Sequence, residues 1–216
     1  GDTLWGIAAR LGVSVDELQA ANGINDSGAI RVGDALLIPG LEGVEGIITI
    51  EQVPFGETLR SLSRRYQAPE SVLIRLNRLS GPGDLYAGAT VMIPKPAQDP
   101  VSSGRLAIQT GQTVLELAAL NGLNPWSLLQ LNQLPGAWQA LPGDVLRLPG
   151  NGFDGPGGFP GEIGAAALEP LVFGQGKTGV ITLATSAPLS LNGSFLGHSL
   201  NFFPGEGGTG FQLHFV

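Results

Sequence analysis

Hydrophobic residues recur at helical spacing in two short stretches near the start of the chain. Leu4, Ile7 and Leu11 lie three or four positions apart, and Leu18 with Ala21 resumes this spacing after a short break. Such spacing places the apolar side chains on one face of a helix. The pattern therefore predicts two short amphipathic helices.

Polar residues stand where they can cap these helices. The Thr3 hydroxyl can accept a hydrogen bond from an amide of the first turn that has no partner within the helix. Ser14 followed by Glu17 is a capping box for the second helix. The apolar, β-prone segment 35–38, which ends at Pro39, predicts a strand.

The same pattern occurs three times along the chain. GDTLWGIAARLGVSVDELQAAN at residues 1–22 returns as GETLRSLSRRYQAPESVLIRLN at 56–77 and as GQTVLELAALNGLNPWSLLQLN at 111–132. The starts are 55 residues apart both times, and eleven residues after the Asn a Gly-to-Pro segment closes each copy. Because the register holds without a gap, we interpret the copies as three homologous units.

Two of the units also have a candidate strand before the first helix. The segments 46–55 and 104–110 can pair with the closing segments 90–93 and 145–148 as two-stranded antiparallel sheets. The predicted order of a complete unit is therefore strand, helix, helix, strand. The sequence opens at Gly1, so the first unit is expected to lack its leading strand and to be the least stable of the three.

The pattern changes after the third unit. Residues 151–164 are rich in Gly and Pro and predict a linker. Residues 165–216 alternate apolar and polar positions and predict a small antiparallel β-domain, truncated at its C-terminus. Its expected strands are 180–184, 189–195, 200–203 and 211–215. Asn192-Gly193 and Leu196-Gly197-His198 compete as its turn, and the pattern does not decide between them.

The predicted fold class is therefore α+β. Its domains are a first unit at residues 1–40, a second at 46–95, a third at 104–150, the linker at 151–164 and the partial β-domain at 165–216. We refer below to the first, second and third units by these ranges.

Composition excludes several kinds of chemistry. The 216 residues contain no cysteine, so no disulfide framework, Cys-ligated zinc site or thiol catalyst is available. The net charge of −7, without a basic cluster, argues against a nucleic-acid partner. No apolar run is long enough for membrane insertion, and no signal peptide is present in the printed sequence.

The run GDTLWGIAARLGVSVDELQAANGI, followed by GDALLIP, resembles the lysin motif, or LysM. The other two units follow the same pattern with Glu57 and Gln112 in place of Asp2, so the resemblance covers residues 1–150. It implies a βααβ module that binds N-acetylglucosamine-containing glycans such as peptidoglycan or chitin. The site would be a shallow groove between the loop before the first helix and the loop after the second. N-acetyl sugars offer an amide, hydroxyls and a methyl group, so no charge is required.

The resemblance implies that each groove has two walls. The loop before the first helix of the unit forms the first wall, and the loop after the second helix forms the second wall. The expected glycan-binding residues are Gly1, Asp2, Thr3, Ile24, Asn25 and Ile30 in the first unit, Gly56, Glu57, Thr58, Leu79, Ser80 and Leu85 in the second, and Gly111, Gln112, Thr113, Leu134, Pro135 and Trp138, with the loop leading to Ala140, in the third. An alternative is that the Thr and acidic side chains only cap helices while backbone groups bind the sugar.

The three tryptophans have separate interpretations. Trp138 either stacks on a sugar face or folds over the core of its unit. Trp5 and Trp126 occupy helix positions where packing is expected. Weak single sites would gain from three linked units that engage one polymer.

GSFLGHSLNFFP and FQLHF, within residues 193–215, resemble the β-rich domain that precedes the catalytic domain in lysostaphin-like zinc metallopeptidases. Those enzymes use an H-x-x-x-D and an H-x-H motif, and neither is present here. His198 and His214 are therefore expected to have structural or surface roles. The resemblance places a zinc-containing catalytic domain after Val216, so no cofactor and no catalytic residue are expected in this chain. GEGGTG at 205–210 precedes a strand and is interpreted as a loop.

Two classes of function follow. In the first, the chain is the non-catalytic cell-wall-targeting part of a peptidoglycan metalloendopeptidase. In the second, it is a non-enzymatic envelope anchor or adhesion protein, with chitin-oligosaccharide binding as a variant. Either class implies an extracellular, cell-wall or periplasmic location. The sequence does not determine the glycan, the unit that binds it or the oligomeric state.

Overall fold

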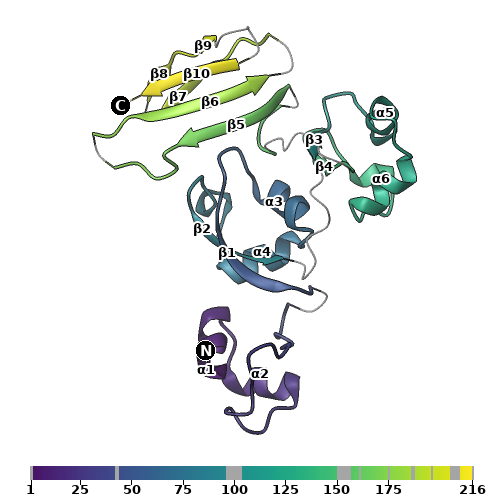
Figure 1. The fold of residues 1–216 in the computed structure, drawn as a ribbon, viewed down its shortest axis with the longest axis vertical. Helices are drawn as coiled ribbons and strands as arrows, with labels where there is room; N and C mark the ends of the chain where they lie inside the picture. Colours follow the sequence, from purple (N-terminus) through teal and green to yellow (C-terminus); the bar gives the residue numbers. More distant parts are fainter. Residues whose placement is uncertain are drawn as a thin grey trace.

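The computed structural model describes residues 2–41, 44–95, 104–149, 157–160, 162–174, 176–185, 188–195, 197–204 and 210–215. The chain combines pairs of short helices with small antiparallel sheets (Figure 1). Among the described residues, no helix has both the length and the apolar character needed to cross a membrane.

The first unit is a helix pair, α1 (Leu4–Leu11) and α2 (Val15–Asn22). Thr3 and Ser14 cap the two helices as predicted, and the Ser14 capping box with Glu17 is present. The predicted strand at 35–38 is wrong, because the structure assigns no strand there. No described strand pairs with this segment, so its backbone has no ladder to join.

The second unit has the predicted order of elements. It consists of β1 (Ile47–Gln52), α3 (Leu59–Tyr66), α4 (Glu70–Asn77), the 3-10 turn η1 (Pro82–Asp84) and β2 (Thr90–Lys95). Strands β1 and β2 pair antiparallel, with Ile50 opposite Met92. The helices cover one side of this pair and bury Val53, Leu62 and Ile93.

Residues 105–147 repeat this arrangement. They form β3 (Arg105–Ala107), α5 (Val114–Leu120), α6 (Pro125–Leu131), the 3-10 turn η2 (Ala137–Gln139) and β4 (Val145–Arg147). Asn124 caps α6 with Pro125 at its first position, as predicted. Ile108, Leu128 and Leu146 lie in the buried core, and β3 pairs antiparallel with β4.

An asparagine ties the second helix of each unit to the closing segment. Its Nδ2 donates to the carbonyl four residues earlier and to the carbonyl fifteen residues later, and its Oδ1 accepts from the later N–H, over 2.6 to 2.9 Å. The three clamps are Asn22 with Leu37, Asn77 with Met92 and Asn132 with Arg147. In the first unit the clamp holds the closing segment although no strand forms there.

The C-terminal part forms a four-stranded antiparallel sheet in the order β5-β6-β10-β9, with strands β5 (Ile163–Glu169), β6 (Gly179–Thr185), β10 (Gly210–Phe215) and β9 (Phe203–Pro204). Strand β5 was not predicted and begins inside the expected linker. A separate hairpin joins β7 (Gly193–Phe195) and β8 (His198–Leu200).

Two details of the predicted β-domain change. Phe195 pairs with His198 and Gly193 lies in β7, so the hairpin does not turn at Asn192-Gly193, and Leu196 of the competing turn lies outside the described residues. The strand expected over 189–195 is confined to β7, and the one expected over 200–203 is divided between β8 and β9. Residues 151–156 of the linker and 205–209 of the GEGGTG loop lie outside the described residues.

The second unit lies between the first unit and the C-terminal sheet, with the third unit at its side (Figure 1). Arg78 and Arg75 donate to backbone carbonyls of the first unit, at Ala9 (3.3 Å) and Pro39 (3.2 Å). The ring of Phe55 lies 5.4 Å from that of Phe159, next to the core of the C-terminal sheet. The second unit is thus the centre of the molecule.

Candidate functional site

Both predicted walls of the first unit attach to one hydrophobic core. Leu4, which follows Thr3, lies in the same cluster as Ile24 and Ile30 of the second wall. Thr3 and Asn25 are exposed, and Gly1 lies outside the described residues. The unit therefore presents exposed polar groups beside half-buried apolar ones, as recognition of a neutral sugar requires.

Two first-wall side chains of the first unit also have structural partners. The Thr3 hydroxyl accepts from Gly6 N at 3.1 Å, and Asp2 pairs with Arg10 at 3.1 Å. The Asp2 and Arg10 side chains are each more than half exposed, so this ion pair is open to water. The Thr3 hydroxyl keeps its own hydrogen for a ligand.

In the second unit, by contrast, the first wall is used to join two units. The Glu57 carboxylate is 1 % exposed and pairs with Arg65 at 2.5 Å and with Arg105 of the third unit at 2.8 Å. Next to it, the buried Asp144 of the third unit pairs with Arg60. Glu57 is therefore committed to guanidinium groups and unavailable to a sugar.

Residues 157–159 lie over the same wall. Gly158 N donates to Gly56 O, and a Cβ on Gly158 would come within 3.3 Å of Thr58 Cγ2. A Cβ on Gly157 would meet Ser61 Cβ at 1.9 Å, so only glycine fits there. The first wall of the second unit is consequently covered by the chain itself.

The second wall of this unit remains partly accessible. Ser80 is exposed, Leu79 is half-buried, and Leu85 packs against the core. Asp84 accepts from the Ser80 and Gly81 amides at 2.6 and 3.0 Å, which fixes the loop. The carbonyl of Leu171 approaches Gly88, so the C-terminal part also touches this side.

The third unit presents the most open pair of walls. Gly111, Thr113 and Pro135 are exposed, whereas Leu134 is buried in the same core as Val114, which follows Thr113. The Thr113 hydroxyl takes part in a capping box with Glu116, as the alternative interpretation of these positions expects. Ala140 is half-buried against the core.

The Trp138 ring packs against Gly136 at the second wall of the third unit. A Cβ on Gly136 would come within 2.1 Å of the indole ring, so the ring lies directly against this glycine. The side chain is nevertheless 75 % exposed, which excludes the alternative that it folds over the core. Trp5 and Trp126 are 72 % and 77 % exposed, so the expectation that they pack is wrong.

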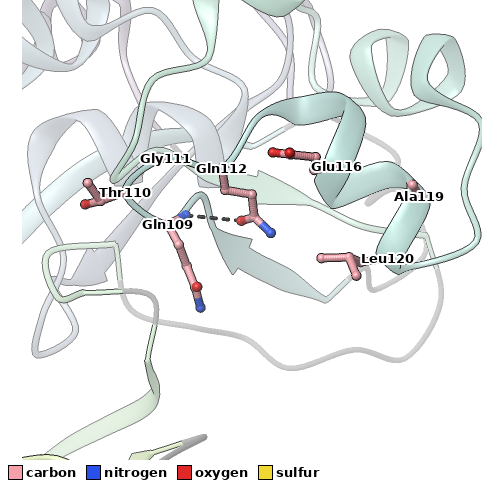
Figure 2. Close-up of a pocket in the computed structure, with 7 residues that line it drawn as sticks. All are labelled: Gln109, Thr110, Gly111, Gln112, Glu116, Ala119 and Leu120. Atoms are coloured by element: carbon pink, nitrogen blue, oxygen red, sulfur yellow. Dashed lines mark hydrogen bonds between the residues drawn. The ribbon is translucent and has the colours of Figure 1, made fainter.

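A shallow hollow of about 490 Å³ lies beside the first wall of the third unit. It is lined by Gln109, Thr110, Gly111, Gln112, Glu116, Ala119 and Leu120 (Figure 2). It shares Gly111 and Gln112 with the expected groove but contains no second-wall residue. Sequence reasoning missed this hollow, because Gln109, Thr110, Glu116, Ala119 and Leu120 belong to neither predicted wall of the groove.

The chain contains two histidines, His198 and His214. His198 is exposed, in accordance with a surface role, and the side chain of His214 lies outside the described residues. Within the part of the chain that the structure describes, no three His, Cys, Asp or Glu side chains gather in a way that could hold a metal ion.

Three of the known proteins that this chain resembles carry names from cell-wall or sporulation biology. The chain is 27% identical over 161 residues to the N-acetylmuramoyl-L-alanine amidase sle1 of Staphylococcus epidermidis, covering 69% of this chain and 49% of that protein. It is 32% identical over 94 residues to the putative sporulation-specific glycosylase YdhD of Bacillus subtilis, covering 44% and 20%. It is 29% identical over 158 residues to an autolysin of Enterococcus faecalis, covering 63% and 21%.

The chain thus spans about half the length of the amidase and about a fifth of the other two relatives. The LysM domain family matches residues 1–39 and 52–94. Two segments of this chain are therefore similar to the LysM domain, and each contains a pair of short helices.

Proposed function

We propose that this chain binds the N-acetylglucosamine-containing glycan of bacterial peptidoglycan. The match of two segments to the LysM domain carries the proposal. The names of the relatives, an N-acetylmuramoyl-L-alanine amidase and an autolysin, support a role in the cell wall. The corresponding location is extracellular, in the cell wall or periplasm.

We include residues 104–150 as a third LysM-type unit. The support is its order of elements and its clamp, in which Asn132 bonds Arg147 as Asn77 bonds Met92. Asparagine side chains that hold the same two elements together in the same way favour a common fold.

The three units are expected to contribute unequally. The third has open walls and Trp138, which packs against Gly136. The exposed face of the Trp138 ring suits the apolar face of a sugar ring. The first offers Asp2, Thr3 and Asn25 beside Ile24. The second has its first wall covered by residues 157–159, so it binds weakest.

For the whole protein, we propose that this chain targets a peptidoglycan hydrolase to its substrate. The resemblance of residues 193–215 favours a zinc metalloendopeptidase, whereas the relatives carry amidase and glycosylase names. Zinc would then be bound by a downstream domain. The sequence beyond Val216 tests this point: the H-x-x-x-D and H-x-H motifs support it, and their absence contradicts it.

The binding proposal is tested by retention on insoluble peptidoglycan and on chitin. Retention on peptidoglycan is expected, and failure to bind either polymer would contradict the proposal. Retention on chitin alone would favour the chitin-binding alternative. An envelope anchor would bind peptidoglycan equally well, so that alternative is decided by the downstream sequence.

The matched pair Trp138→Ala and Trp126→Ala assigns the site. Both indoles are about three-quarters exposed, but Trp126 lies in the first turn of α6 whereas Trp138 lies in the second wall. Loss of one stacked ring corresponds to about 1 kcal/mol, so Trp138→Ala should weaken binding roughly fivefold. Trp126→Ala should leave it unchanged, and equal effects of the two substitutions would refute the assignment.

A further inference from the structure

The hollow on the third unit exists because two residues differ from their counterparts in the other units. In the first unit, Asp2 pairs with Arg10 across the start and end of α1. In the second, Glu57 pairs in the same way with Arg65. The equivalent residues of the third unit, by the 55-residue register, are Gln112 and Leu120.

This replacement changes both the shape and the charge of the surface. Gln112 and Leu120 do not form an ion pair, and the space that the arginine side chain fills elsewhere is open between them. Leu120 is 77 % exposed, so its apolar side chain is open to contact with a ligand. Figure 2 shows Leu120 and the Gln112 amide extending toward one another across the hollow.

The groups around the hollow suit a neutral, hydrogen-bonding ligand. Gln112 Oε1 accepts from Gln109 N at 3.2 Å, which fixes the amide and directs its NH₂ group into the hollow. The Glu116 carboxylate accepts from the amide and hydroxyl of Thr113 at 2.8 and 3.1 Å, so it is occupied by the helix cap. Ala119 and Leu120 supply an apolar floor.

The hollow is continuous with the candidate groove, because Gly111 and Gln112 belong to both. Its volume of about 490 Å³ is in the range of small-molecule sites. No basic side chain lines it, which disfavours anionic ligands.

We propose that this hollow is an additional subsite of the third unit, in which a further N-acetylated amino sugar of the bound glycan contacts Gln112 and Leu120. The subsite rests on the proposed glycan binding and extends it: the third unit contacts a longer stretch of chain than the first or second. Its acetamido group pairs with the Gln112 amide, and its methyl group covers Leu120.

The test restores the ion pair of the first unit in the full chain. The double variant Gln112→Asp with Leu120→Arg should fill the hollow, and Gln112→Asp alone controls for changes at the first wall. Binding of short and long N-acetylglucosamine oligomers is measured by titration calorimetry. Because filling the hollow removes a contact that corresponds to about 1 kcal/mol, the double variant should bind long oligomers roughly fivefold more weakly than Gln112→Asp does, whereas the two variants should bind short oligomers equally well.

Each other outcome overturns the proposal in a distinguishable way. Equal affinity of Gln112→Asp and the double variant for long oligomers would show that the hollow does not contact the glycan. If the wild type binds neither short nor long oligomers, the result contradicts the proposed function itself. A difference in sedimentation behaviour between the double variant and Gln112→Asp, without a difference in glycan affinity, would show that Leu120 contacts another protein molecule instead. Far-ultraviolet circular dichroism confirms that each variant is folded.

Discussion

The clamp at Asn132 offers the sharpest test of how the third unit is held together. Asn132 is 6 % exposed and makes three hydrogen bonds, two of them to the backbone of Arg147 in β4. Asn132→Ala removes all three and leaves buried backbone groups without a partner. At about 1 kcal/mol for each bond, the free energy of unfolding of this unit should fall by about 3 kcal/mol.

The assay is native-state amide exchange at residues 145–147, with Asn121→Ala as the matched control. Asn121 lies in the same unit but makes one side-chain bond, to Leu117 O at 2.8 Å, and is itself exposed. Its replacement should cost about 1 kcal/mol or less. If both substitutions lower protection of β4 by the same amount, the clamp is not a determinant of the fold and the reasoning is refuted.

Three further predictions concern the rest of the chain. Glu57→Gln should destabilise the joined second and third units by about 3 to 5 kcal/mol in denaturant unfolding, because it removes the buried negative charge that pairs with Arg65 and Arg105; an unchanged midpoint would contradict this. Gly157→Ala should displace residues 157–159 from Ser61 and speed amide exchange at 56–61, and unchanged exchange would show that the contact tolerates a methyl group. Hydrogen bonds from the amide and hydroxyl of Ser14 lower the pKa of Glu17 below its ordinary 4.5, so its contribution to stability is present above the unfolded-state pKa and is lost as the pH falls through the folded value; Glu17→Gln should flatten this part of the acid unfolding curve, and an unaltered curve would argue against it.

The helix pairs could be predicted because their signals are local. The caps at Thr3 and Ser14 and the apolar spacing act within a few residues, so pattern and structure agree. The prediction of a strand at 35–38 was wrong for a non-local reason. Its apolar residues favour a strand, but a strand also needs a partner backbone, and the described structure provides none.

Packing between units could not be read from the pattern. Glu57 occupies a position that is exposed in the first unit, yet here it is buried by Arg105, which lies far away in the sequence. Trp5 and Trp126 look like core residues because they are large and apolar, but their helices turn them outward. The pattern gives the spacing within a helix, and small errors in assigning the buried face reverse the expected burial.

The most direct test of the account is a nuclear magnetic resonance titration of the full chain with soluble peptidoglycan glycan fragments. The account predicts that amide signals of residues 111–113 and 134–138 shift most, with the Trp138 indole signal among them, while those of 56–58 shift least. Shifts concentrated at 56–58, or confined to the C-terminal sheet, would contradict it.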